Sequence, residues 1–437
     1  MRLYNYQREK LNNVKADKRV AFYWDMGTGK TFVGSEKMDQ IDNSVNLVIC
    51  QKSKINDWID HFKTHYPEYR IYDLTNKGSL ERFIDNYNSF KDVDDKPFIL
   101  GVINYELAFR RQELLDLRDY FTLLLDESSM VQNEAAKRTK FVMQMADQAD
   151  GVILLSGTPT GGKYENLWSQ LHMLGWNISK KMYWNQYVEV EYLDQVGRSI
   201  PIVIGYKNVD RLKRKMKQYG CDFLKAEEVL ELPDQNFEVV KVEPIKQYKQ
   251  FQKTSLVKIA GKELVGDTTL TQLLHERELC SFYNSNKSQT IKDLITSTDE
   301  NIVIFYNFNA ELKELKKVAR ECEKDCSVIN GTDKSGVQMV NCSLNHNYRY
   351  TPILLIQYQS GAMGLNLQDY SRRIIYYSLP LSSELFEQSK KRIHRIGQSK
   401  TCFYYILLCK NSVEEKIYST LLKRKDYTER LFEKGER

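Results

Sequence analysis

A short segment of the chain combines the residue types that bind phosphate groups: Gly27, Thr28, Gly29, Lys30 and Thr31 follow one another. Backbone N–H groups at the start of a helix bind anionic oxygens, and glycine lets the chain wrap closely around them. At this spacing the lysine contacts the β- and γ-phosphates of a nucleotide, and the threonine hydroxyl holds Mg²⁺. The segment therefore predicts a site for ATP or a similar nucleotide with Mg²⁺.

Trp24 stands where the common phosphate-loop pattern has its first glycine, six residues before the lysine. The alternative to a nucleotide site is a glycine-rich turn that happens to carry a surface lysine. The flanks favour the nucleotide site, because the apolar run RVAFYW precedes the loop and the helix-like run KTFVGSEKMDQI follows it. A loop between a strand and a helix is the context that phosphate binding requires.

An acidic pair ends another apolar run, FTLLLDE, at Asp126 and Glu127. Asp126 is expected to hold Mg²⁺ directly or through water, and Glu127 to orient or deprotonate the attacking water. Acidic residues often follow a strand, so the pair alone is weak evidence. After a glycine-rich loop in this chain order, it indicates hydrolysis of a nucleotide.

Two further segments could complete such a site. In LLSGTPTGG, Ser156 and Thr158 could couple the phosphate site to movement, and a plain turn is the alternative. In EQSKKRIHRIGQSK, Arg392 and Arg395 are three residues apart, so they share a face if the segment is helical. Arginines presented to a γ-phosphate spread transition-state charge. A solvated basic face or a nucleic-acid contact is the alternative for this pair.

The overall composition is that of a folded protein large enough for two or three domains. The chain has 437 residues, of which 42% are hydrophobic and 28% charged, and its net charge of +6 permits a polyanionic partner. No apolar run is long enough to cross a bilayer, and the start lacks a signal-peptide stretch. The eight cysteines then favour reduced thiols in a cytoplasm, with no membrane partner.

Short apolar runs alternate with helix-like segments from RVAFYW to GVILLSGT, and again from ENIVIFYNF to TCFYYILLC. Such runs are typical of buried parallel strands, so the predicted fold is α/β, with two lobes that are each a doubly wound, mostly parallel sheet. The alternation lapses between 176 and 300, where LELPDQNFEVVKVEPI indicates a linker with a strand. We expect an N-terminal lobe over residues 1–230 and a C-terminal lobe over 231–437.

One cysteine grouping has loosely zinc-like spacing: Cys322, Cys326, Cys342 and His346. Cys322 lies on a strongly helical stretch, and the segment between the two pairs has no zinc-knuckle turn chemistry. The sequence therefore favours ordinary thiols and leaves metal binding open.

Together these segments resemble the superfamily 2 helicase-like ATPases, and within them the SWI/SNF-like group of double-stranded DNA translocases. The resemblance covers nearly the whole chain in the expected order, and the ending H-R-I-G-Q is its most specific element. The group's motif I does not use the earlier glycine, so Trp24 is compatible with a nucleotide site. The stretches that carry the resemblance are LYNYQ (Q motif), WDMGTGKT (motif I), DESSMVQNEAAKRTK (motif II), LLSGTPTGG (motif III) and EQSKKRIHRIGQ (motif VI).

The resemblance implies two RecA-like lobes with ATP and Mg²⁺ in the cleft between them. Lobe one would supply Tyr6 and Gln7 of the adenine-reading Q motif, the glycine loop and the acidic pair; lobe two would supply Arg392 and Arg395. The implied activity is a DNA-dependent ATPase that translocates on double-stranded DNA and remodels protein–DNA or branched DNA. The implied setting is replication or recombination in a bacterial or phage-infected cytoplasm, with proteins of those processes as candidate partners of a monomeric motor.

The grip on DNA is expected to be independent of sequence and directed at the phosphate backbone. By motif position, the candidate contacts are Ser53, Lys54, Asn104, Tyr105, Ser360 and Gly361. For each of them, a loop residue without any contact is the alternative.

Ser128 and Ser129 depart from the group, which has Ala-His there. That histidine usually links the nucleotide site to other motifs, so Ser129 is expected to weaken or reroute the coupling. Two other functions stay open. One is a strand-separating helicase, although the sequence shows no recognisable wedge or pin. The other is a nucleotide-gated loader or adaptor that translocates little.

Overall fold

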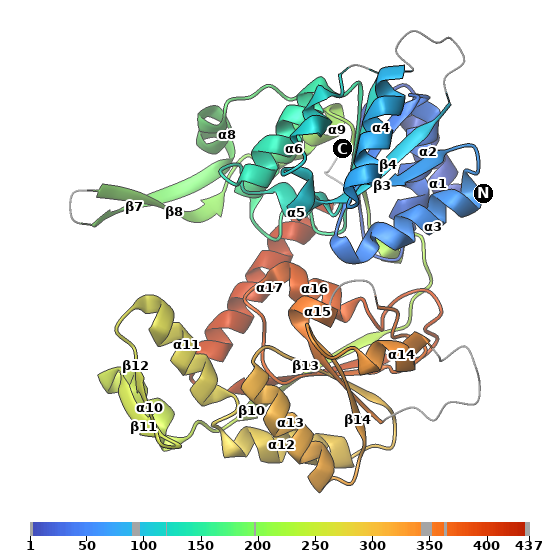
Figure 1. Ribbon diagram of the computed structural model, residues 1–437. Coiled ribbons are helices and arrows are strands. Elements are labelled where there is room, and N and C mark those ends of the chain that lie inside the picture. The colour runs from blue at the N-terminus through green and yellow to red at the C-terminus, as the bar shows by residue number, and fades with distance from the viewer. Residues whose placement is uncertain are drawn as a thin grey trace. The chain divides into compact units, whose positions relative to one another are not determined.

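The structure, a computed structural model, describes residues 3–89, 97–118, 120–195, 198–341, 352–361 and 365–432. It divides into two units, the first comprising Met1–Leu230 with Lys425–Arg437, and the second Glu231–Arg424 (Figure 1). Among the described residues, no helix has both the length and the apolar character needed to span a membrane.

A seven-stranded sheet forms the centre of the first unit, in the order β3-β4-β2-β5-β6-β1-β9, and all its neighbouring strands are parallel. Five of the strands coincide with the apolar runs, which confirms those predictions; β3 and β9 were not predicted. The strands are β1 (Arg19–Trp24), β2 (Val45–Cys50), β3 (Arg70–Asp73), β4 (Ile99–Asn104), β5 (Phe121–Asp126), β6 (Gly151–Ser156) and β9 (Cys221–Leu224).

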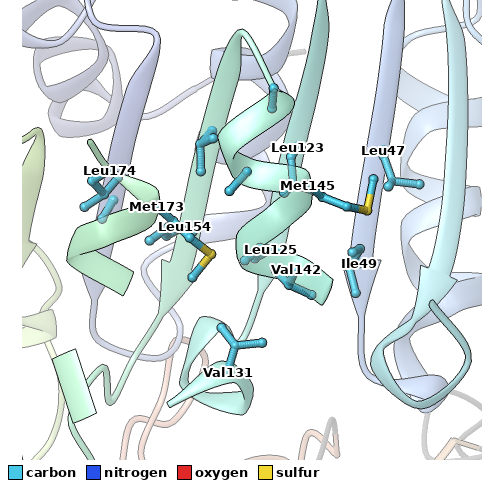
Figure 2. Packing of buried hydrophobic residues seen from close by; sticks show 14 of the residues in the cluster. Leu47, Ile49, Leu123, Leu125, Val131, Val142, Met145, Leu154, Met173 and Leu174 are labelled. Atoms are coloured by element: carbon cyan, nitrogen blue, oxygen red, sulfur yellow. The ribbon is translucent and has the colours of Figure 1, made fainter. Parts of the chain in front are cut away.

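Helices cover both faces of this sheet, because alternate strand residues point to opposite sides. Phe22 packs in one apolar cluster with α1, α2 and α3, whereas Tyr23 packs in another with α4, α6, α7 and α9. Figure 2 shows Met145 of α6 beside Leu123 of β5, and Val142 of α6 beside Leu125. The helices are α1 (Asn5–Asn13), α2 (Lys30–Ile41), α3 (Ile55–His65), α4 (Lys77–Ser89), α5 (Tyr105–Ala108), α6 (Lys137–Gln148), α7 (Trp168–Met173), α8 (Lys180–Tyr187) and α9 (Val209–Gln218), with 3₁₀ turns η1 (Lys52–Lys54), η2 (Gln112–Asp116), η3 (Ser128–Val131), η4 (Tyr164–Leu167) and η5 (Ala226–Glu228).

An antiparallel hairpin, β7 (Val188–Gln195) and β8 (Arg198–Tyr206), extends away from the rest of the first unit (Figure 1). It carries large apolar side chains in solvent: Tyr192 is 64% exposed and Leu193 49%. The sequence predicted mainly helix in this region and no pin-like element, so the hairpin is an addition from the structure.

The second unit is built on a six-stranded sheet in the order β10-β17-β16-β13-β15-β14, again with parallel neighbours. The fold is therefore α/β with two doubly wound sheets, as the sequence predicted. The elements are β10 (Gln235–Val242), α10 (Lys246–Thr254), the hairpin β11 (Leu256–Ile259) and β12 (Lys262–Val265), α11 (Thr269–Cys280), α12 (Ser285–Thr296), β13 (Ile302–Tyr306), α13 (Asn309–Glu321), β14 (Cys326–Ile329), α14 (Ser335–Asn341), β15 (Ile353–Gln357), α15 (Tyr358–Gly361), β16 (Arg373–Tyr376), α16 (Ser383–Lys390), β17 (Cys402–Cys409) and α17 (Val413–Phe432).

The end of α17 groups with the first unit, whereas the sequence placed all of 231–437 in the C-terminal lobe. The physical reason is aromatic packing. The Tyr164 hydroxyl donates to the Tyr427 carbonyl over 2.7 Å, and the Tyr427 ring packs edge-on against Tyr206. Phe432 packs in the same way against Phe223 of β9.

Candidate nucleotide site

The glycine loop lies between β1 and α2, and α2 begins at Lys30. Gly27 and Gly29 have φ of 84° and 78°, a region that glycine adopts without strain. A Cβ on Gly29 would lie 2.3 Å from the Gln7 amide nitrogen, so a larger residue would displace the Gln7 side chain. The loop leads directly into the first turn of α2, and the N-terminal end of a helix suits an anionic ligand.

Helix α1 brings the Q motif to this loop. The Tyr6 hydroxyl and the Gln7 amide both donate to the Thr28 carbonyl, over 2.9 and 3.1 Å. The Gln7 side-chain oxygen, Oε1, accepts from the Tyr4 backbone N–H over 2.9 Å. The structure thus assembles the Q motif with the loop, while an adenine contact stays a prediction.

Trp24 is a core residue, which explains why no glycine is needed there. Its side chain is fully buried, and its indole N–H donates to the Asp222 carboxylate of β9 over 2.7 Å. Lys10 of α1 forms an ion pair with the same carboxylate, also at 2.7 Å. The turn that follows is made by residues 25–29, and Trp24 anchors its start.

The Lys30 ammonium folds over the end of β1. It donates to the carbonyls of Trp24 and Asp25 over 2.8 and 3.1 Å, and the Thr28 hydroxyl donates to the same Asp25 carbonyl over 2.7 Å. Burial raises the pKa of Asp126 at the end of β5, and the Lys30 charge opposes that shift. The predicted phosphate-binding lysine and the predicted metal-binding carboxylate therefore lie in one electrostatic environment.

Asp126 ends β5 and is held by Trp58 of α3, whose indole N–H donates to it over 2.9 Å. Burial raises the pKa of Asp126, and the Trp58 hydrogen bond, Lys30 and Lys54 oppose that shift. The Asp126 carboxylate and the Thr31 hydroxyl offer the oxygen donors that suit Mg²⁺, which keeps few protein ligands and takes the rest from water and phosphate. The residues present therefore fit Mg²⁺ with a nucleotide.

Glu127 follows at a positive φ of 52°, which turns the chain sharply after the strand. The Ser156 hydroxyl at the end of β6 donates to the Glu127 carboxylate over 3.4 Å. The Thr158 backbone N–H donates in turn to the Ser156 hydroxyl over 3.1 Å. Because β5, β6 and β1 are neighbours in the sheet, motifs I, II and III meet at one edge.

The predicted DNA contacts in the first unit differ in exposure. Ser53 is exposed on η1, and Lys54 beside it forms an ion pair with Asp57 at 2.6 Å. Asn104 is 6% exposed and donates its amide to the Glu106 carboxylate over 2.8 Å.

Tyr105 is fully buried, and its hydroxyl donates to the Asp126 carbonyl over 2.9 Å. The Tyr105 side chain thus supports the end of β5, and a DNA contact at this position stays a prediction. Ser360 and Gly361 lie on α15, and the Ser360 side chain is outside the described part of the chain.

Arg392 and Arg395 were expected on a helix, but α16 ends at Lys390 and both lie in the turns that follow. The reason is tertiary: the Arg392 carbonyl accepts from the Leu367 N–H over 3.0 Å instead of continuing the helix. The Arg392 guanidinium donates to the Leu365 carbonyl over 3.3 Å, and Arg395 donates to the Asn366 side chain. Burial lowers the pKa of Arg395, while Asp369 opposes the shift. Both arginines thus pack on the segment 365–369.

The zinc alternative is not supported by the described residues. Cys322 follows α13 and Cys326 begins β14, and burial raises the pKa of both thiols. Cys342 and His346 lie outside the described ranges. Within those ranges, no three histidine, cysteine, aspartate or glutamate side chains gather as metal ligands.

Comparison with known proteins decides the family. Residues 16–301 match the SNF2-related domain, and residues 286–397 match the helicase conserved C-terminal domain. The chain belongs to the SNF2-related family. It is accordingly an ATP-hydrolysing enzyme of the helicase-like class.

Relatives of this SNF2-related chain come from bacteria and animals. One is an uncharacterized ATP-dependent helicase of Mycoplasma pneumoniae, 23% identical over 95% of this chain and 41% of its own length. Another is a SWI/SNF-related matrix-associated actin-dependent regulator of chromatin subfamily A-like protein 1 homolog of Caenorhabditis elegans, 21% identical over 97% of this chain and 61% of its own. The chain thus spans about two to three fifths of the length of these curated relatives.

One solved structure is also similar, the Sulfolobus solfataricus SWI2/SNF2 ATPase core in complex with dsDNA. It covers 98% of this chain and 92% of its own, with 18% identity and a TM-score of 0.42.

The serine pair of this SNF2-related chain is buried, with Ser128 fully covered and Ser129 6% exposed. The Ser128 hydroxyl donates to the Gln170 side-chain oxygen over 2.8 Å. Sequence reasoning missed Gln170, because a glutamine on a short helix carries no local signal for such a role.

Proposed function

We propose that the chain is an ATPase stimulated by duplex DNA, which moves along double-stranded DNA and remodels protein–DNA or branched DNA. The observation that carries the proposal is the meeting of three motifs at the edge of the first sheet, with Lys30 close to Asp126 and Ser156 bonded to Glu127. Membership of the SNF2-related family supports the choice of a DNA motor among ATPases.

In this proposal Lys30, Gly27, Gly29 and the first N–H groups of α2 bind the phosphates of ATP. Thr31 and Asp126 would hold Mg²⁺, which when bound supplies positive charge beside the transferred phosphoryl group. Glu127 accepts the proton of the attacking water. Tyr6 and Gln7 hold the loop in place by donating hydrogen bonds to the Thr28 carbonyl.

Arg392 and Arg395 of the second unit are proposed to complete the nucleotide site and to spread the charge of the transition state. Both are held on the segment 365–369, so movement of that segment would carry the two arginines together. ATP-dependent closure of the units and reopening after hydrolysis would then convert turnover into movement.

The DNA grip is proposed to use Ser53 and Lys54 on η1 and the backbone near Asn104, with α15 at Ser360 and Gly361 in the second unit. Contacts of this kind bind the phosphates of the DNA backbone, so they do not distinguish one DNA sequence from another. Replication or recombination in a bacterial or phage-infected cell is the proposed setting, with the protein acting as a monomer.

A panel of duplex, forked and single-stranded DNA tests the proposal by steady-state ATPase assay. Strong stimulation by duplex DNA, and displacement of a triplex-forming third strand without unwinding of the duplex, are the expected results. Hydrolysis that is indifferent to every nucleic acid would reject the DNA motor and favour a nucleotide-gated loader or adaptor.

Strand separation is a second candidate function, and the β7–β8 hairpin is the observation that favours it. Its exposed Tyr192 and Leu193 could stack on or wedge against bases at a fork. Unwinding of a forked duplex that is lost in a Tyr192→Ser/Leu193→Ser variant, with ATPase activity retained, would establish this candidate. No unwinding by the unmodified protein would remove it.

A further inference from the structure

The buried side chain of Gln170 connects the segments that follow β5 and β6 with β1, the strand beside β6 in the first sheet. Gln170 lies on α7 and is fully buried. Its side-chain hydrogen bonds in the described part of the chain go to Tyr23, Ser128 and Pro159, and none of them goes to the phosphate loop. Its side-chain oxygen accepts from the Ser128 hydroxyl over 2.8 Å and from the Tyr23 hydroxyl over 3.1 Å. Its side-chain nitrogen donates to the Pro159 carbonyl over 2.7 Å.

The orientation of this amide follows from its partners. The Pro159 carbonyl can only accept, so the nitrogen must face it, and the oxygen then faces two hydroxyl donors. Burial raises the pKa of Tyr23 well above its usual value, so its hydroxyl stays protonated and able to donate. Both lone-pair directions of the amide oxygen are thereby used. Such a satisfied buried network holds its members in one arrangement.

Two partners of Gln170, Ser128 and Pro159, lie close in sequence to the hydrogen bond between Ser156 of motif III and Glu127 of motif II. Ser128 directly follows Glu127, and Pro159 directly follows Thr158, whose N–H holds the Ser156 hydroxyl against the Glu127 carboxylate. Tyr23 lies on β1, just before the phosphate loop.

A second set of bonds holds the same two segments. Gln132, at the end of η3, also donates to the Pro159 carbonyl, over 3.2 Å, and accepts from the Asn166 amide over 2.8 Å. The Ser169 hydroxyl on α7 donates to the Val131 carbonyl over 2.7 Å. Helix α7 is therefore fixed to η3 independently of Gln170. Loss of the Gln170 side chain should then leave the turn after β6 with the longer bond from Gln132 to Pro159 and loosen it without detaching the helix.

We propose that Gln170 is a positioning residue for ATP hydrolysis, which sets the Ser156–Thr158 turn relative to Glu127 by joining Pro159 to Ser128. In this proposal, the coupling that Ser129 was expected to weaken or reroute runs through Ser128 and Gln170. The inference rests on the proposed ATPase chemistry of Glu127. Displacement of a catalytic group by about 1 Å can cost on the order of 100-fold in rate, so a loosened turn should reduce turnover.

The test compares Gln170→Leu with a matched control, Asn43→Leu. Asn43 is also buried, at 6% exposure, and donates to the Thr122 hydroxyl over 3.0 Å and to the Asp150 carboxylate over 3.2 Å, at the opposite ends of β5 and β6. Both variants lose hydrogen bonds at or just beyond the ends of β5 and β6. A merely structural role for Gln170 predicts that both lower the thermal midpoint and leave kcat per folded molecule unchanged.

We expect Gln170→Leu to lower kcat by about tenfold or more with an unchanged KM for ATP, and Asn43→Leu to leave kcat unchanged. Ser128→Ala, which removes only one hydroxyl, should lower kcat in the same direction. The double variant Ser128→Ala/Gln170→Leu should be no slower than Gln170→Leu alone, because the two residues act through one link. An unchanged kcat in Gln170→Leu, or additive losses in the double variant, would overturn the proposal.

Hydrogen exchange gives a readout that does not depend on ATPase activity. Peptides covering 127–132 and 156–163 should exchange faster in Gln170→Leu than in Asn43→Leu. Equal exchange in the two variants would reject the positioning role even if the protein hydrolysed no ATP. Conversely, ATPase activity that ignores DNA would reject the proposed motor while the comparison of Gln170→Leu with Asn43→Leu still decides the link.

Discussion

Trp58 donates its indole N–H to the Asp126 carboxylate across 2.9 Å, which joins α3 to the end of β5. This bond is the largest influence that holds down the pKa of Asp126 against burial. A hydrogen bond to the charged form favours that form, so removing it raises the pKa further. Trp58→Phe should therefore shift the acid limb of the ATPase pH profile to higher pH, since protonated Asp126 no longer binds Mg²⁺.

The pH dependence of kcat/KM at saturating Mg²⁺ measures this shift. Trp176→Phe is the matched control, because Trp176 is a buried tryptophan that packs on Tyr183 and Tyr187. An acid limb that stays in place in Trp58→Phe, or that moves equally in Trp176→Phe, would contradict the assignment.

Lys30→Ala and Glu127→Gln should fail at different steps. Lys30→Ala removes the ammonium from the phosphate loop, so both nucleotide affinity and turnover should fall. Glu127→Gln keeps the shape of the site and removes only the proton acceptor. It should bind a fluorescent ATP analogue normally while its kcat falls about 100-fold or more.

Lys18→Ala serves as the control for the lysine variant. Lys18 pairs with Asp150 at the start of β1, at the opposite edge of the sheet. Normal turnover in Lys30→Ala would show that the loop is a glycine-rich turn with a surface lysine.

Arg395→Ala should spare ATP binding and lower turnover by about 10³-fold or more if the side chain acts on the transition state. The measurement is kcat together with the affinity for an ATP analogue. Arg320→Ala is the control, since that arginine donates only to the Lys316 carbonyl of its own helix among the described contacts. Equal kcat in both variants would remove Arg395 from the catalytic set.

Lys54→Gln should weaken binding to duplex DNA uniformly across sequences. It should also reduce the slope of log affinity against log salt by about 1, because one phosphate contact is lost. Fluorescence anisotropy over a range of salt concentrations measures the slope. Lys63→Gln, at the other end of the same α3 segment, is the control and should keep the original slope. An unaltered slope in Lys54→Gln would move the DNA grip away from η1.

Trp24→Gly would install the glycine of the common phosphate-loop pattern, and we expect it to damage the protein. The indole is fully buried, so its removal should lower the free energy of unfolding by about 3–5 kcal/mol. Trp24→Phe keeps most of the packing and loses the bond to Asp222, at a cost of about 1–3 kcal/mol. Urea unfolding measures both. A glycine variant as stable as the unmodified protein would mean that Trp24 does not anchor the turn.

The sheet strands were predictable because a strand buried on both faces must be apolar along its length. That rule identified β1, β2, β4, β5 and β6. It could not identify β3, a four-residue strand in which no residue is buried, or β7 of the hairpin, which mixes acidic and apolar residues. Residues of edge and protruding strands are less buried, so their sequences show a weaker apolar pattern.

The site was predictable where a role depends on local sequence and unpredictable where it depends on a distant partner. The loop residues from Gly27 to Thr31 come with their own strand and helix. Tyr105 was named as a DNA contact by motif position alone, and its burial against the end of β5 depends on contacts that the local sequence does not reveal. The end of α16 before Arg392 is likewise set by Leu367, which no local spacing reveals.

The aromatic packing of Tyr427 and Phe432 has a consequence for synthesis of the protein. The first unit contains the chain's earliest strands, yet its packing is completed by side chains from the end of α17. On the ribosome, β1 must first wait for β6 and β9, its sheet neighbours, more than a hundred residues later. The nascent unit then stays incomplete until the second unit has been translated. Assembly of the nucleotide-binding unit is thus tied to synthesis of nearly the whole chain, and a fragment ending at Leu230 lacks part of its own packing.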